Sequence, residues 1–508
     1  MGGIACLIPA HTQPLPLPFS LSFRSAAEKS ASPLHCPHRI EPSAHVCTFH
    51  PHRETIILNE RQLRRARAQP QLKLDPIVRS LLDTDFYKLL MLQFIWKNFP
   101  TTRVTSEIHN RTTHIRLADR ISTAALRDQL NHVRTLRLRR SELVWLAGNT
   151  FYGTKQIFHP AFLDWLERDF RLSDYEIIEP QEGNQAGQFI IRFSGLWTEV
   201  TLWEVYSLAI VSEMKTRAAL ATLNELELDV LYARAKTRLW DKIELLRHVE
   251  GLHLSDFGTR RRHSFLWQEY CVEALSTALN GDNPAARQEA RFSGTSNTAL
   301  AYKHDLEAMG TNAHELPMAM AAMASLGSDD DLRASQYRVL ELWRQSYDNE
   351  LLILLPDTFG TTQFLQGAPD CVTRWTGERV DSKDPFLAGD EYIAWLRSRG
   401  QDPRTKRLIA SDALDASTIV ELHNYFNNRI RFSAVWGTLL TNDFRGCHPR
   451  NEDTFEPISL VCKLTSADGI PTVKLSDNPS KSTGPADIIA RYRRVFNTPV
   501  QTEVPVLV

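Results

Sequence analysis

The clearest strand candidate in the sequence lies in Leu351-Leu352-Ile353-Leu354-Leu355-Pro356-Asp357-Thr358-Phe359-Gly360. In it, five consecutive apolar residues end abruptly in a proline, an acid and small residues. A short run that is apolar on both faces is typical of a parallel strand buried on both sides. A helical stretch over 332–347 precedes the run, so this segment predicts one unit of an alternating α/β sheet, with Asp357 at the polar end of its strand.

The same pattern recurs from about residue 250 onward, where short apolar or β-branched runs end in small, polar or acidic residues and helical stretches follow. The other run ends are Asp256-Phe257-Gly258-Thr259, Ser293-Gly294-Thr295-Ser296-Asn297, Asn312-Ala313-His314-Glu315, Val380-Asp381-Ser382, Ser411-Asp412-Ala413-Leu414-Asp415 and Trp436-Gly437-Thr438. Alternating strands and helices favour a parallel sheet with helices outside. Polar clusters at strand C-termini are typical of the catalytic face of a (βα) barrel. An open doubly wound sheet places its chemistry there too, and periodicity alone does not separate the two.

The remainder of the chain differs from this region. Residues 71–205 contain helical stretches and one strand candidate at 188–193, which predicts an α+β domain. Strands expected over 460–473 assign about 455–508 to the same domain, and 206–454 to the barrel. Residues 1–55 hold eight of the 26 prolines and six of the 17 histidines but only three acids. We therefore expect 1–70 to be a disordered or non-native extension.

Composition excludes several classes of function. The 508 residues carry 59 Lys and Arg against 60 Asp and Glu, so the basic surface of a general nucleic-acid binder is missing. No apolar run is long enough to span a membrane. Seven cysteines without a C-x-x-C pair indicate neither a zinc ribbon nor a disulfide framework. The histidines and cysteines between 35 and 52 lack regular ligand spacing and are read as compositional bias. These features predict a cytoplasmic enzyme.

Acidic residues recur at the predicted strand ends, where Asp357, Asp381, Asp384, Asp412 and Asp415 lie beside glycine, serine or threonine. Any one of them is adequately explained as a turn residue or helix cap. As a set at strand ends, they suit Mg²⁺ that enters with a phosphorylated substrate, because Mg²⁺ takes few protein ligands and keeps its waters. No spacing indicates a tightly held metal.

Several further residues beside the predicted strand ends or beside polar turns are candidates for binding or catalysis. Gly437-Thr438 resembles a phosphate cradle, although a single Gly-Thr is a weak signal. Arg260 has the forked geometry that binds a carboxylate or phosphate. His314 is either structural or an acid, base or nucleophile. Tyr87 and Phe257 are core aromatics by default, or stack on a flat heteroaromatic substrate.

Seven short motifs, taken in chain order, resemble those of a known enzyme family. They are Leu81-Leu82-Asp83-Thr84-Asp85-Phe86-Tyr87-Lys88, Leu202-Trp203-Glu204-Val205, Asp256-Phe257-Gly258-Thr259-Arg260-Arg261-Arg262, Gly294-Thr295-Ser296-Asn297, Gly310-Thr311-Asn312-Ala313-His314-Glu315, Ser411-Asp412-Ala413-Leu414-Asp415 and Lys474-Leu475-Ser476-Asp477. As a set these motifs resemble the nicotinate phosphoribosyltransferases over about residues 78–495. The resemblance implies an irregular α/β barrel with an α+β domain built from both chain ends. It also implies a homodimer with shared active sites.

The resemblance implies that nicotinate and phosphoribosyl pyrophosphate give nicotinate mononucleotide and pyrophosphate, in salvage biosynthesis of NAD. ATP, with Mg²⁺ as cofactor, would be hydrolysed through phosphorylation of His314. Tyr87, from the partner subunit, and Phe257 would sandwich the pyridine ring. Arg260 would face nicotinate, with Ser296 and Thr295 beside it.

The same resemblance places the phosphoribosyl donor on a second group of residues. Arg379 and Asp381 would hold the donor together with Asp357 and Asp412, and Gly437-Thr438 would cradle its 5′-phosphate. His314, Asp357 and Asp381 are the implied catalytic set.

Lys383 departs from the family, since many relatives carry a glycine there. The lysine disfavours a left-handed backbone in that loop and offers a further phosphate contact. The nearest alternative activity is a nicotinamide phosphoribosyltransferase, whose relatives typically carry Asp at the position of Ser296. A quinolinate phosphoribosyltransferase lacks the Ala-His-Glu motif. An inactive paralogue that serves as a binding subunit is the alternative from another class, and retention of His314 and Arg260 speaks against it.

Overall fold

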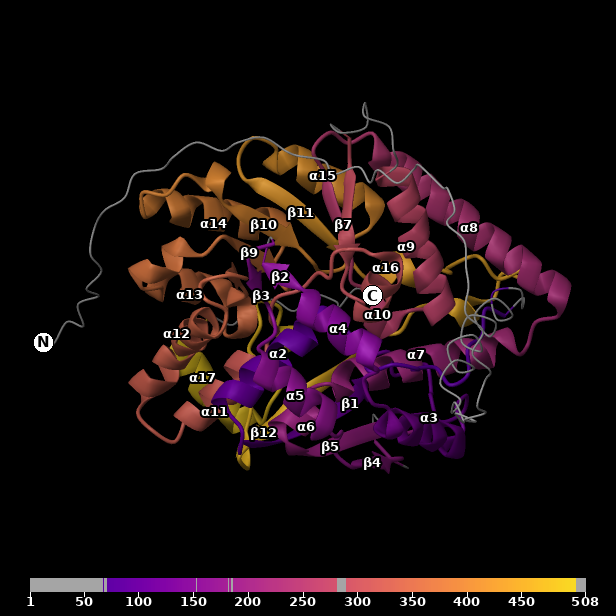
Figure 1. Cartoon of the computed structure of the whole chain (residues 1–508), viewed down its shortest axis with the longest axis horizontal. Coiled ribbons are helices and arrows are strands. Elements are labelled where there is room, and N and C mark those ends of the chain that lie inside the picture. The colour runs from indigo at the N-terminus through magenta and orange to yellow at the C-terminus, as the bar shows by residue number, and fades with distance from the viewer. Residues whose placement is uncertain are drawn as a thin grey trace, which may run out of the picture. The chain divides into compact units, whose positions relative to one another are not determined.

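Two sheets and their surrounding helices make up the part of the chain that the computed structural model describes (Figure 1). That part is residue 67 and residues 71–498 without 152, 181, 184–185 and 281–288. All of it belongs to one compact unit, Ile57–Val508. The predicted extension over 1–70, apart from Arg67, and the segment 35–52 lie outside the described residues. Within the described part, no helix is both long and apolar enough to cross a membrane.

The larger sheet is parallel throughout, with the strand order β7-β6-β11-β10-β9-β8. Its strands are β6 (His253–Asp256), β7 (Arg291–Thr295), β8 (Ile353–Leu354), β9 (Gly377–Val380), β10 (Arg407–Ala410) and β11 (Arg431–Trp436). The helices between and after them are α9 (Phe265–Leu279), α10 (Thr298–His304), α11 (Glu315–Ala324), α12 (Asp329–Ser346), α13 (Thr361–Gly367), α14 (Pro385–Ser398), α15 (Ala416–Phe426) and α16 (Thr438–Thr441). The predicted mixed α/β fold with a parallel sheet is therefore confirmed.

Two details of that prediction come out differently. In the described residues the parallel sheet ends at β7 and β8, which do not pair with each other, so no closed barrel is found. The apolar run at 351–355 forms only the two-residue edge strand β8. Pro356 has no N–H to extend the ladder, and Leu351 takes a φ of 55°. The run is nevertheless largely buried, so its apolar character marked burial rather than strand length.

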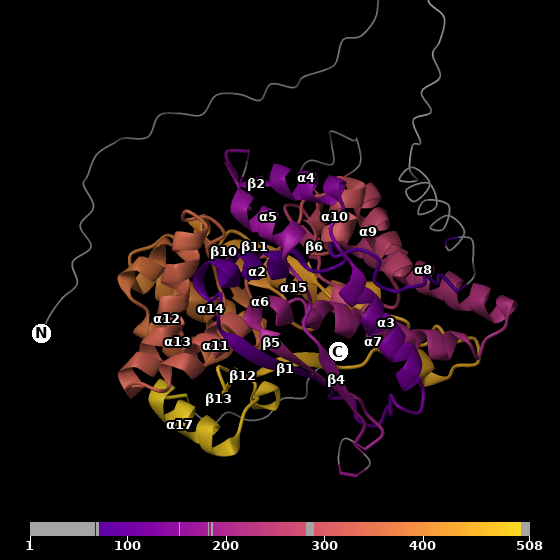
Figure 2. The same cartoon turned by 60° about the horizontal axis from the view of Figure 1, so that its bottom comes forward.

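The second sheet is antiparallel and draws on both ends of the described chain, in the order β13-β12-β1-β5-β4. Its strands are β1 (Arg103–Asn110), β4 (Tyr175–Ile178), β5 (Ile190–Leu196), β12 (Leu460–Ala467) and β13 (Ile470–Pro471), while β2 (Thr150–Phe151) and β3 (Lys155–Gln156) form a separate hairpin. Figure 2 shows β12, in yellow, beside the indigo β1. This pairing sets Lys463 opposite Glu107.

Buried helices join the two sheets. They are α2 (Phe86–Asn98), α6 (Trp197–Val200) and α7 (Trp203–Leu220), while α3 (Thr123–Thr135), α4 (Arg140–Gly148), α5 (Pro160–Arg168), α17 (Ala486–Phe496) and the largely exposed α8 (Glu225–Arg247) lie farther outside. Trp197 and Trp203 are among the largest fully buried side chains. Helix α7 runs through the boundary expected near 205, and the division into 71–205, 206–454 and 455–508 stays a prediction.

Candidate active site

A cavity opens where four parallel strands end, and β12 of the other sheet forms its opposite wall. Its lining comprises Phe257, Gly258, Arg260 and Arg261 after β6, Arg379 and Asp381 at the end of β9, Ser411–Leu414 after β10, Gly437–Leu439 after β11, Leu460–Lys463 of β12, and Arg111, Glu204, Leu208, Val435, Lys474 and Lys481. A second cavity adjoins it, lined in part by Tyr87, His314 and Glu315. Arg260, Arg379 and Asp381 line both.

His314 lines the adjoining cavity, in the position just before α11. Its Nε2 is 2.8 Å from Asp381 Oδ2 and 3.6 Å from Asp357 Oδ1, and its Nδ1 is 2.9 Å from the Thr358 hydroxyl. Burial lowers the pKa of His314 to about 4, against the opposing effect of the two carboxylates, so the ring is neutral at neutral pH. An ionised Asp381 only accepts hydrogen bonds. Nε2 therefore carries the proton, and the lone pair lies on Nδ1.

The carboxylates around His314 are held by several donors. Ser382 donates to Asp357 Oδ2 over 2.5 Å, and the Lys474 ammonium lies 3.6 Å from the same oxygen. Burial acts to raise the pKa of Asp381, but the hydrogen bond from His314 and the nearby guanidinium of Arg379 together bring it well below its usual range. The liganding atoms of His314, Asp357 and Asp381 lie within 4.8 Å of one another. Carboxylate oxygens suit Mg²⁺, whereas an imidazole suits transition metals better.

Positive charge dominates the main cavity, which seven cationic and three acidic side chains line. The cations are Arg111, Arg260, Arg261, Arg379, Lys463, Lys474 and Lys481, and the acids are Glu204, Asp381 and Asp412. Burial and the neighbouring Lys474 lower the pKa of Lys463 to about 7. Burial and Arg260 lower the pKa of Arg261 to about 10. When a polyanion binds beside such a side chain, its negative charge favours the charged form of the side chain and raises the pKa again.

Arg260 reaches the cavity between two acids. Its NH1 donates to Glu204 Oε1 over 3.2 Å, and its Nε lies 3.7 Å from Asp85 Oδ2. Asp85 in turn accepts from the Ser296 hydroxyl over 2.7 Å. Ser296 is fully buried and lines neither cavity, so it lies behind Asp85 rather than on the cavity surface.

The other residues expected around the pyridine ring are distributed between the two cavities and the interior. Phe257 lines the main cavity, and Tyr87 of the same chain lines the adjoining one. Thr295 is fully buried and donates to Asp256 Oδ2 over 2.7 Å. A contribution of Tyr87 from a partner subunit stays a prediction.

Two glycines that line the main cavity differ in whether the structure leaves room for a side chain. Gly437-Thr438 lines the main cavity, but a Cβ at Gly437 would meet only Phe257 O, at 3.6 Å. A Cβ at Gly258 would lie 2.1 Å from Thr441 Oγ1, so Gly258 is the position that excludes a side chain. Lys383 donates to Glu391 Oε2 over 2.5 Å and to Thr362 Oγ1 over 3.2 Å and lines neither cavity.

Sequence reasoning missed several cavity residues. Lys463 lies in β12, which reaches the cavity through its pairing with β1. Lys481 also lines the cavity and donates to Asp412 Oδ2 over 2.6 Å. Lys474 stood in a recognised motif but had no assigned role. A charged residue inside the apolar strand 460–467 was the available signal for Lys463. Glu204 stood in a motif as well, and nothing in its spacing indicated that it would pair with Arg260.

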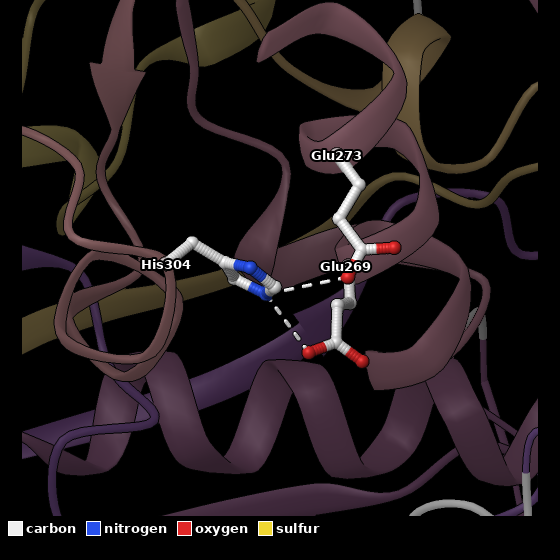
Figure 3. Close-up of side chains that lie close together, drawn as sticks. All are labelled: Glu269, Glu273 and His304. Atoms are coloured by element: carbon white, nitrogen blue, oxygen red, sulfur yellow. Dashed lines mark hydrogen bonds and ion pairs between the residues drawn. The ribbon is translucent and has the colours of Figure 1, made fainter. Parts of the chain in front are cut away.

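A second group of acids and a histidine lies on α9 and at the end of α10 and lines neither cavity (Figure 3). His304 Nε2 is 3.0 Å from Glu269 Oε1 and 3.7 Å from Glu273 Oε1. Lys303 also pairs with Glu269, and Arg67 lies 2.8 Å from Glu273. Because these cations already neutralise the carboxylates, the group is explained as an ion-pair cluster that holds residue 67 against α9.

Comparisons with known proteins agree with each other. Residues 252–500 match the model of the nicotinate phosphoribosyltransferase family, and residues 82–212 match that of its N-terminal domain. The nicotinate phosphoribosyltransferase of Vibrio cholerae is 30% identical, with a TM-score of 0.72 over 85% of this chain and 97% of that one. The enzyme of Porphyromonas gingivalis is 26% identical, with a TM-score of 0.69 over 83% and 100%. A Saccharomyces cerevisiae structure at 24% identity and a TM-score of 0.70, over 84% and 99%, shows likeness of fold alone.

Proposed function

The chain belongs to the nicotinate phosphoribosyltransferase family, and we propose that it makes nicotinate mononucleotide and pyrophosphate from nicotinate and phosphoribosyl pyrophosphate. The observation that carries the proposal is the main cavity, which opens at the ends of the parallel strands and is lined by Arg260 and six further cations. One arginine suits a planar carboxylate, and the further cations suit a sugar that carries several phosphates.

In the proposed reaction the nitrogen of the pyridine ring attacks the anomeric carbon of the donor. A nitrogen–carbon bond forms, and the carbon–oxygen bond to pyrophosphate breaks with its electron pair leaving on oxygen. This displacement passes through oxocarbenium-like charge and needs positioning and electrostatic stabilisation more than a strong base. Asp381 and Asp412 are suitably placed to hold the ribose and a Mg²⁺ that enters with the donor, while Lys463, Lys474 and Lys481 neutralise the departing pyrophosphate.

His314 is the proposed acceptor of a phosphoryl group from ATP. Its ring is neutral, and its Nε2–H donates to Asp381. The lone pair on Nδ1 is free to attack the γ-phosphorus of ATP once the Thr358 hydroxyl turns away. The nitrogen–phosphorus bond forms as the γ-phosphate separates from ADP, and water later releases inorganic phosphate. A phosphate beside Asp357 and Asp381 changes the local charge, which gives ATP hydrolysis a means to bias the transfer. As the family resemblance implies, the proposal also includes that two copies of this chain form a homodimer.

A single-turnover experiment with labelled donor tests the activity. Wild-type protein with nicotinate, Mg²⁺ and donor should convert the label into nicotinate mononucleotide with one pyrophosphate per product. Asp381→Asn should reduce the rate by about a hundredfold or more while the protein still folds. A wild-type protein that binds the donor but transfers no label would contradict the proposal and identify an inactive paralogue.

A further inference from the structure

Lys88 is a buried lysine that the proposed function does not use. It lies in α2, directly after Tyr87, and its side chain is 0% exposed. The Nζ atom is 2.6 Å from Glu204 Oε2 and 2.5 Å from Glu315 Oε2. Burial acts to lower the pKa of Lys88, but these two carboxylates outweigh it and hold the ammonium charged.

Each of the two carboxylates leads to a different part of the site. The other oxygen of Glu204 accepts from Arg260, and burial is outweighed by Lys88 and Arg260, so the pKa of Glu204 falls to about 2. Glu315 directly follows His314 and is the first residue of α11. Its other oxygen accepts from Trp197 Nε1 over 2.5 Å. In Figures 1 and 2, α2, α6 and α11 lie together.

The contacts thus form a continuous chain of charges, from Arg260 through Glu204 and Lys88 to Glu315, beside His314. We propose that Lys88 is a positioning residue that couples the acid-binding arginine to the phosphate-accepting histidine, an inference that rests on the proposed function. Nicotinate and Glu204 compete for the guanidinium of Arg260. Because Lys88 shares the charge of Glu204, Arg260 can turn to the substrate without leaving Glu204 unpaired in a buried position.

The same ammonium fixes the start of α11. With Lys88 and Trp197 both on Glu315, the backbone that presents His314 is held from two sides. A shift in Glu204 when nicotinate binds is therefore transmitted to Glu315 through one shared ion, with no other residue between them. A purely structural role would leave substrate affinity and the use of ATP unchanged in a folded variant.

Lys88→Met, Lys88→Arg and Glu315→Gln test the coupling, with Lys406→Met as the matched control. Lys406 is also a buried lysine, but its ammonium donates to the carbonyls of Thr373 and Trp375 and lines neither cavity. The measurements are the KM values for nicotinate and donor, the ATP hydrolysed per product, and Tm. Lys88→Met should raise the nicotinate KM by about tenfold or more, change the donor KM by less than about threefold, and alter the ATP used per product. Glu315→Gln should alter the use of ATP more than the nicotinate KM.

The control and the weaker variants keep the result interpretable. Lys406→Met should lower Tm alone. If Lys88→Met does not fold, Lys88→Arg should still change both readouts, because a guanidinium cannot hold both carboxylates in the geometry of the ammonium. Folded variants of Lys88 and Glu315 with wild-type KM values and wild-type ATP use would overturn the coupling and leave the proposed function intact. A wild-type protein without activity in the same assay would instead overturn the proposed function and, with it, the coupling.

Discussion

Replacing Ser296 with aspartate should separate nicotinate from nicotinamide at this site. The Ser296 hydroxyl lies 2.7 Å from Asp85 Oδ1, so a carboxylate there would lie about 4 Å from another carboxylate, a repulsion of about 4 kcal/mol at an effective dielectric constant of about 20. Burial already raises the pKa of Asp85, so protonating it at neutral pH costs less than protonating an exposed aspartate and relieves part of this repulsion. The new charge would also lie about 6 Å from Arg260 and attract it by about 3 kcal/mol, which nicotinate must overcome.

We therefore expect Ser296→Asp to lower kcat/KM for nicotinate by about a hundredfold, to change the donor KM by less than about threefold, and to reduce Tm. Nicotinamide has no carboxylate to be repelled, so its relative use should rise. Ser296→Ala is the control, because it adds no charge and removes only the hydrogen bond to the Asp85 carboxylate, worth about 2 kcal/mol of stability. The assay is steady-state product formation with each pyridine at saturating donor. If Ser296→Asp and Ser296→Ala have the same kcat/KM for nicotinate, the electrostatic reasoning is refuted.

Three further outcomes are expected. Incubation with γ-labelled ATP should give the protein a base-stable, acid-labile label. The variant His314→Ala should fold, take no label and still form nicotinate mononucleotide slowly. Label that survives in His314→Ala would exclude this histidine as the acceptor. Because the pKa of Lys463 is lowered to about 7 and bound polyphosphate raises it, donor binding should take up a proton and the donor KM should rise between about pH 7 and 9. Lys463→Met should show neither effect by calorimetry and kinetics, and an unchanged pH dependence in that variant would locate the titration elsewhere. A chain that starts at Gln69 should keep full activity and lose no more than about 2 °C in Tm, since the ion pairs of Arg67 with Glu269 and Glu273 are partly exposed. Loss of activity would show that the preceding residues contribute to the site.

The sequence was informative about the fold where local pattern and burial agree. The run ends at Val380 and Trp436 coincide with the ends of β9 and β11, and the helical stretch 332–347 corresponds to α12. The run at 351–355 was misleading because it lies at the sheet edge, where burial against helices needs no ladder partner. Closure of the sheet depends on which strands meet at its edges, and short apolar runs carry no information about that.

The site was predictable where residues follow a parallel strand directly, since strand C-termini meet at one face. This explains why Arg260, Asp381, Asp412 and Thr438 converge on one cavity. Lys463 on the opposite wall could not be placed in the same way, because its position depends on the pairing of β12 with β1, whose paired residues lie 350 or more residues apart in the chain. Burial of Ser296 behind Asp85 was equally hidden, because side-chain contacts between α2 and the end of β7 have no local sequence signal.

One comparison of pyridine substrates tests whether the protein is an ATP-coupled nicotinate phosphoribosyltransferase. Purified protein with Mg²⁺ and phosphoribosyl pyrophosphate is given nicotinate or nicotinamide, each with and without ATP, and the mononucleotide formed is measured. We expect product from nicotinate, a higher rate or extent when ATP is present, and little or no product from nicotinamide. Efficient use of nicotinamide, or the same rate and extent from nicotinate without ATP, would contradict this expectation.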